Sequence, residues 1–141
     1  MKPFCSYHMG DYFAHWLAMG KRLGDKTPRI FYTNWFRKTE DGRWLWPGFG
    51  ENSRVLKWMC ERVDGKAGAQ KTAIGYMPAV GDLDLAGLDV PAEDMKELLR
   101  VDVAGWKEEA KDMQEHFSQF GDRLPEALAR QLKELIERLG S

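Results

Sequence analysis

The residues of this sequence best suited to chemistry lie between Asn34 and Arg54, in the run NWFRKTEDGRWLWPGFGENSR. Aromatic faces stack on planar heterocycles, the glycines on either side of Phe49 let a backbone approach a ligand closely, and the carboxamide of Asn52 can both donate and accept hydrogen bonds. The run therefore indicates a site for a planar, polar ligand. A hairpin whose aromatics form a small core, with Asn52 only capping a helix, explains the same residues equally well.

Other common chemistry is missing from the sequence. The phosphate-binding and nucleophile motifs GxxxxGK[ST], GxGxxG and GxSxG are absent. The histidines His8, His15 and His116 share no metal-ligand spacing, and Cys5 and Cys60 form no CxxC pair. We therefore assign no catalytic residue and no metal ligand to this chain, and we expect both cysteines to be reduced thiols.

Length and composition exclude several classes of protein. The 141 residues suit one domain or one piece of a larger one. With 43% apolar and 30% charged residues the chain is not disordered, and no stretch approaches the ~20 apolar residues that span a bilayer. A net charge of −1 gives no general attraction to nucleic acid or anionic lipid. We expect neither a nucleic acid nor a membrane as partner.

The elements that must position the aromatic run are a hairpin and the helices around it, an α+β arrangement. Asp41-Gly42 is a good hairpin turn, and the β-forming residues before and after it predict two strands. Asp11, Asn52 and Asp102 are the predicted N-caps, and together with apolar periodicity they predict helices elsewhere. The predicted strands are 29–36, 43–46 and 72–77. The first predicted helix begins near Gly10-Asp11, and four more cover 53–63, 91–99, 103–120 and 125–139. Residues 79–90 are predicted to be a loop.

The run NWFRKTEDGRWLWPGFGENSRVLKW closely resembles the nucleotide-base segment of GTP-dependent phosphoenolpyruvate carboxykinase. The opening, MKPFCSYHMGDYFAHWL, resembles the family's stretch just before it, although Ser6 and His8 replace the usual Gly and Asn. The resemblance implies that the chain is the C-terminal part of a larger α/β enzyme. Residues 1–90 would be the base-binding part and residues 91–141 a helical tail.

That family converts oxaloacetate and GTP to phosphoenolpyruvate, carbon dioxide and GDP, in the cytoplasm, with Mn²⁺ and Mg²⁺, in gluconeogenesis or anaplerosis. The resemblance implies that the phosphate loop and metal ligands lie upstream, so the chain alone should be inactive. Its partners would be a guanine nucleotide and the N-terminal remainder of the enzyme, and the isolated chain should self-associate.

Carried over by position, the family's guanine pocket falls on residues of the aromatic run. Phe36 and Phe49 would sandwich the base, Trp44 (where the family usually has Phe) would close the wall, and Asn52 would read the guanine edge. Gly50 and Glu51 would supply backbone contacts. The nucleotide-binding set is thus Phe36, Trp44, Phe49, Gly50, Glu51 and Asn52.

Two other readings differ in class. A free-standing module could stack single-stranded nucleic acid on these aromatics, but Glu40, Asp41 and Glu51 interrupt the basic residues that such a groove needs. The chain could also be a helical interaction fragment with an incidental aromatic hairpin.

Overall fold

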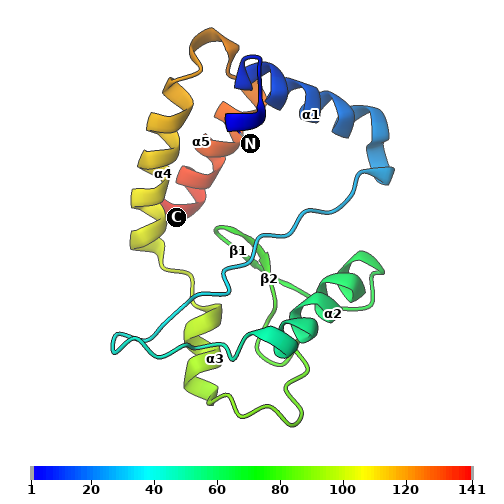
Figure 1. Ribbon diagram of the computed structural model, residues 1–141, viewed down its shortest axis with the longest axis vertical. Helices are drawn as coiled ribbons and strands as arrows, with labels where there is room; N and C mark the ends of the chain where they lie inside the picture. The colour runs from blue at the N-terminus through cyan, green and yellow to red at the C-terminus, as the bar shows by residue number, and fades with distance from the viewer. Residues whose placement is uncertain (1, 141) are drawn as a thin grey trace. The chain divides into compact units, whose positions relative to one another are not determined.

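The computed structural model describes residues 2–140, which form helices and one small antiparallel sheet (Figure 1). This confirms the predicted α+β class. Short 3₁₀ helices cover Lys2–Phe4, Gly24–Lys26, Phe49–Glu51 and Gly121–Arg123. The main elements are α1 (Met9–Leu23), α2 (Asn52–Val63), β1 (Gln70–Thr72), β2 (Gly75–Met77), α3 (Ala92–Leu99), α4 (Val103–Ser118) and α5 (Glu126–Gly140).

The described chain forms two compact units. Residues 29–101, here the aromatic unit, form one, and residues 2–28 together with 102–140, here the helical unit, form the other. The predicted boundary at residue 90 separates functions and stays a prediction. The compact units follow different boundaries, because α1 belongs with the two C-terminal helices.

In the helical unit, α4 and α5 run antiparallel beside each other (Figure 1). Asp102 caps α4 as predicted, its carboxylate accepting from the Gly105 N–H at 3.1 Å. Phe120 is 6% exposed, and its ring meets Phe13 of α1 edge-on with centroids 5.4 Å apart. Aromatic packing therefore joins α1 to the end of α4.

The start of α1 differs from the prediction that Asp11 caps it. The helix begins at Met9, and His8 is its N-cap, with Nδ1 accepting from the Gly10 N–H at 3.0 Å. Asp11 instead pairs with Arg123, 3.0 Å away. The imidazole Nδ1 already accepts from one of the free N–H groups at the start of the helix, so the carboxylate of Asp11, the third helical residue, binds a cation instead of capping.

The aromatic unit has its own core. Trp46, Trp58, Leu83 and Met95 are the buried members, each at most 9% exposed. Leu83 comes from the predicted loop, so that loop is confirmed and serves to cover the tryptophans. The core thus joins four segments of the chain: the run before α2, α2 itself, the 79–90 loop and α3.

The predicted strands at 29–36 and 43–46 are wrong. Only an isolated bridge between Lys38 and Trp44 forms there, although Gly42, at φ 89°, makes the predicted turn. Thr39 closes this narrow ribbon, its N–H donating to the Arg43 carbonyl at 2.9 Å. β-forming residues favour strands when they pack on a half-buried surface, whereas Ile30 is 93% exposed here.

The predicted strand at 72–77 is instead the hairpin of β1 and β2, with Thr72 opposite Gly75. The chain reverses at residues 73 and 74, and Gly75, which follows them, has φ 135°, a conformation that side-chain-bearing residues rarely adopt. The helix predicted from 53 begins one residue earlier, at Asn52, and the one predicted to reach 120 ends at Ser118.

Candidate functional site

The candidate site is built on residues 36–44, here the aromatic ribbon, which begins with Phe36, turns at Gly42 and ends with Trp44. Asn34 fixes its start, since its side-chain oxygen accepts from the Phe36 N–H at 2.9 Å. The rings of Phe36 and Trp44 meet edge-on with centroids 6.1 Å apart, yet 73% of Phe36 and 50% of Trp44 remain exposed. Lys38 lies 4.0 Å above the Trp44 ring, a cation–π contact. The structure therefore brings two of the predicted rings together on an open surface.

Two arginines fasten this ribbon to α3. Arg43 donates to both carboxylate oxygens of Asp94, at 2.6 and 3.0 Å, and Arg37 donates to Glu97 at 2.7 Å and to the Leu98 carbonyl at 3.0 Å. Paired donation of this kind is among the stronger polar contacts in proteins. These contacts hold the segment that carries the exposed rings in a fixed position against α3.

The arginines of this contact lower the pKa values of the carboxyl groups that they bind. Hydrogen bonding from Arg43 lowers the pKa of Asp94 below its ordinary value, against the opposing effect of burial. Hydrogen bonding from Arg100, followed by the charges of Arg100 and Arg37, lowers the pKa of Glu97. Both carboxylates are therefore ionised at neutral pH and hold the ribbon.

Phe49 presents its ring to solvent in a costly backbone conformation. It has φ 47°, the only positive φ of a residue other than glycine among residues 2–140, and its side chain is 98% exposed. A bulky residue in this region costs roughly 1–3 kcal/mol. An exposed aromatic ring held at such a cost points to a contact with a ligand, because folding alone gains nothing from it.

Asn52 is not the predicted helix cap. It is the first residue of α2, and its Oδ1 accepts from the buried Trp46 Nε1 at 2.9 Å. The N-cap position belongs to Glu51, which makes no side-chain capping bond; its carboxylate instead binds Arg54 Nε at 2.5 Å. The Gly50 carbonyl accepts from the Ser53 hydroxyl at 2.7 Å.

Sequence reasoning missed Trp46 as part of the site. In the sequence Trp46 is one aromatic among many in the run, and only the fold brings its indole N–H to the Asn52 side chain. Phe49 makes no ring contact with the other rings among residues 2–140, so the sandwich of Phe36 and Phe49 stays a prediction.

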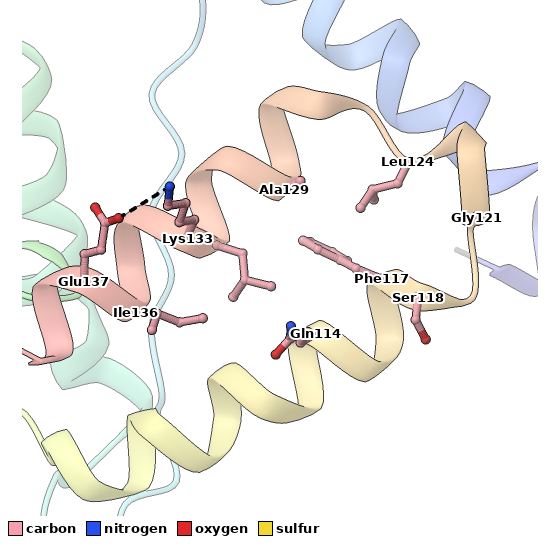
Figure 2. A pocket seen from close by; sticks show the side chains of 10 residues that line it. Gln114, Phe117, Ser118, Gly121, Leu124, Ala129, Lys133, Ile136 and Glu137 are labelled. Atoms are coloured by element: carbon pink, nitrogen blue, oxygen red, sulfur yellow. Dashed lines mark ion pairs between the residues drawn. The ribbon is translucent and has the colours of Figure 1, made fainter.

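The helical unit contains a hollow. It measures about 620 Å³ and lies between α4 and α5. Figure 2 shows Phe117 of α4 and Leu124 beyond it turned toward this space, opposite Ile136 of α5. Lys133 and Glu137, 3.9 Å apart, lie at its edge. Its lining is mainly apolar, so it is suited to packing rather than to polar chemistry.

Within residues 2–140, no group of three or more His, Cys, Asp or Glu side chains is arranged to hold a metal ion. In the same part of the chain, no helix has both the length and the apolar character that crossing a bilayer requires.

Comparison with known families covers nearly the whole chain. The profile described as "Phosphoenolpyruvate carboxykinase C-terminal P-loop domain" matches residues 1–138. Proteins named "Phosphoenolpyruvate carboxykinase [GTP]" are similar to it: one from Neocallimastix frontalis is 53% identical over 141 residues, and one from Treponema pallidum (strain Nichols) is 51% identical over 141 residues.

A further protein of that name, from Corynebacterium efficiens, is 46% identical over 139 residues. Each match takes in 99% of this chain but only 23% of the relative, so the chain spans less than a quarter of the length of these proteins. None of these names refers to nucleic-acid binding, and the reading as a single-stranded nucleic-acid module finds no support.

Proposed function

Since this chain belongs to the GTP-dependent phosphoenolpyruvate carboxykinase family, as part of the C-terminal domain, we propose that it supplies the guanine-binding portion of such an enzyme. The complete protein would convert oxaloacetate and GTP to phosphoenolpyruvate, carbon dioxide and GDP. The observation that carries this proposal is the ring of Phe49, 98% exposed and held at φ 47° close in sequence to the Asn52 amide.

In this proposal each residue of the predicted set has a role. Phe36 and Phe49 stack on the two faces of the base, and Trp44, held against Phe36, forms the wall beside it. Asn52 reads the edge of the base. Gly50 and Glu51 contribute backbone groups, consistent with the Glu51 carboxylate being engaged by Arg54.

In this proposal the chemistry of phosphoryl transfer, which depends on positioning and on metal charge, is carried out by the remainder of the enzyme. By the family resemblance, that remainder would bind the Mn²⁺ and Mg²⁺ of the reaction and would be the partner of this chain. The cytoplasm, and gluconeogenesis or anaplerosis, are the setting that the family resemblance suggests.

The proposal is tested in the complete enzyme with Asn52→Ser, which shortens the side chain and removes the amide. We expect the ratio of kcat/KM for GTP over ATP to fall roughly tenfold to hundredfold, because a mismatched buried polar group costs ~1–3 kcal/mol. An unchanged ratio would contradict base reading by Asn52. Titration with a single-stranded oligonucleotide should give no binding that competes with GTP.

A further inference from the structure

The orientation of the Asn52 amide is determined by one buried neighbour. Trp46 Nε1 donates to Asn52 Oδ1 at 2.9 Å, and an indole N–H can only donate. The carboxamide oxygen Oδ1 must therefore face Trp46, and the amino group Nδ2 must point away from it. Without such a neighbour the two branches are nearly identical in shape, and the amide could turn over.

Both ends of this hydrogen bond are held firmly. Trp46 is 6% exposed and packs with Trp58 and Met95 in the core of the aromatic unit. Asn52 is the first residue of α2, so its backbone is fixed by the helix. Turning the amide over would put its amino group against the indole N–H and leave that buried donor unsatisfied. The turned state is disfavoured by roughly tenfold to hundredfold.

The orientation matters because purines present opposite patterns. A 6-oxo purine such as guanine shows an acceptor, O6, beside a donor, N1–H. Adenine shows a donor, the 6-amino group, beside an acceptor, N1. A carboxamide also has a donor beside an acceptor, so one orientation matches guanine and the turned orientation matches adenine. A single asparagine is therefore ambiguous until something fixes its direction.

We propose that Trp46 is a positioning residue that sets the base specificity of this site, by holding the Asn52 amide in the single orientation that matches a 6-oxo purine. The inference rests on the proposed function, in which Asn52 meets the edge of the base. In this role Trp46, which is 6% exposed, acts through Asn52 and not on the base itself. Its effect is to remove the alternative in which Asn52 accepts adenine.

The test compares two tryptophans of the same core in the complete enzyme. Trp46→Phe keeps an aromatic ring and removes the N–H. Trp58→Phe is the matched control, since Trp58 is 4% exposed and its Nε1 is buried with no hydrogen-bond partner among residues 2–140. The measured quantities are kcat/KM for GTP, ITP and ATP. ITP carries O6 and N1–H but lacks the 2-amino group of GTP.

We expect Trp46→Phe to lower the GTP/ATP and ITP/ATP ratios of kcat/KM by roughly tenfold, because the amide gains its second orientation. The GTP/ITP ratio of kcat/KM should stay unchanged. Trp58→Phe should leave all three ratios unchanged. General loosening of the core would weaken the three nucleotides alike, so it cannot produce the expected pattern. Ratios in Trp46→Phe equal to those in Trp58→Phe would overturn the inference.

Two further results separate the possible failures. If Asn52→Ser narrows GTP/ATP but Trp46→Phe does not, the base-reading role stands and the positioning role of Trp46 is refuted. If Asn52→Ser changes nothing, both are refuted. Should Trp46→Phe fail to fold, β-(3-benzothienyl)alanine incorporated at position 46 replaces only the indole N–H by sulfur, and the same ratios decide the question.

Discussion

Arg43 and Asp94 are joined by two hydrogen bonds, Nη1 to Oδ2 at 2.6 Å and Nη2 to Oδ1 at 3.0 Å, although 51 residues separate them in the chain. Asp94 is only 8% exposed, while more than half of the Arg43 side chain is open to solvent. The pair therefore fastens the aromatic ribbon to α3 at the buried end of the contact.

This pair should make the stability of the chain sensitive to acid. Arg43 lowers the pKa of Asp94 in the folded state, so the carboxylate stabilises the fold above its unfolded pKa of about 3.9, and this stabilisation is lost as the pH falls through the lower folded value. In thermal melts followed by circular dichroism, Asp94→Asn should lower Tm at pH 7 and lose less further stability below about pH 4. In an Arg43→Met background, Asp94→Asn should no longer alter the acid slope; an unaltered effect would contradict the pairing.

Phe49 should contribute affinity without discrimination, because every base has a stacking face. In the complete enzyme, Phe49→Ala should lower kcat/KM for GTP and ATP alike by roughly tenfold to hundredfold, from ~1–3 kcal/mol of stacking. Phe49→Gly should lose as much affinity yet unfold about 1 kcal/mol less readily than Phe49→Ala, since glycine accepts φ 47° without strain. Loss confined to GTP would argue against simple stacking.

Gly10 and Gly20, both in α1, should respond in opposite ways to alanine. A Cβ at Gly10 would lie 2.3 Å from the carbonyl oxygen of Arg123, whereas one at Gly20 would meet nothing within 4 Å. Gly10→Ala should therefore destabilise the chain by about 1–3 kcal/mol through overpacking. Gly20→Ala should stabilise it by roughly 0.5–1 kcal/mol through helix propensity. Urea denaturation of the two variants measures the difference, and equal midpoints would rule out the close approach.

The 141-residue chain alone should form no phosphoenolpyruvate from oxaloacetate and GTP with Mn²⁺. Stacking and edge reading bind a base, but phosphoryl transfer needs phosphate positioning and metal charge. A coupled assay for phosphoenolpyruvate checks this, with the complete enzyme as the positive control. Activity that depends on Mn²⁺ and is abolished by Phe49→Ala would refute it.

The apolar hollow between α4 and α5 should drive association of the isolated chain. Ile136 at its edge is 45% exposed, and exposed apolar patches favour self-contact. We expect oligomers in size-exclusion chromatography with light scattering, and more monomer in Ile136→Lys. Ala104→Lys, at an exposed position on α4 outside the hollow, adds the same single positive charge and should not alter the oligomers. A monomeric parent chain at high concentration would contradict the prediction.

Much of the helical part could be predicted from the sequence, because the signals are local. The carboxylate of Asp102 needs only the N–H three residues ahead of it to cap α4, and the turn at Gly42 needs only a residue that accepts positive φ. The run that carries the candidate site could likewise be located, because its aromatics, its glycines and Asn52 lie close together in the sequence. The roles of Phe36, Phe49 and Asn52 came from the family resemblance and stay predictions.

The sequence by itself thus determined which segments form helices, where the chain turns and which run carries the candidate site. Only the tertiary structure decided that the β-forming residues before Asn34 form no strand, that Arg43 binds Asp94 and that Asn52 accepts from Trp46 rather than capping α2. The physical reason is that strand pairing, ion pairing and the burial of an indole depend on partners brought together by folding. A carboxamide has equal local reasons to cap a helix or to bind a neighbour, and only the buried donor of Trp46 decides between them.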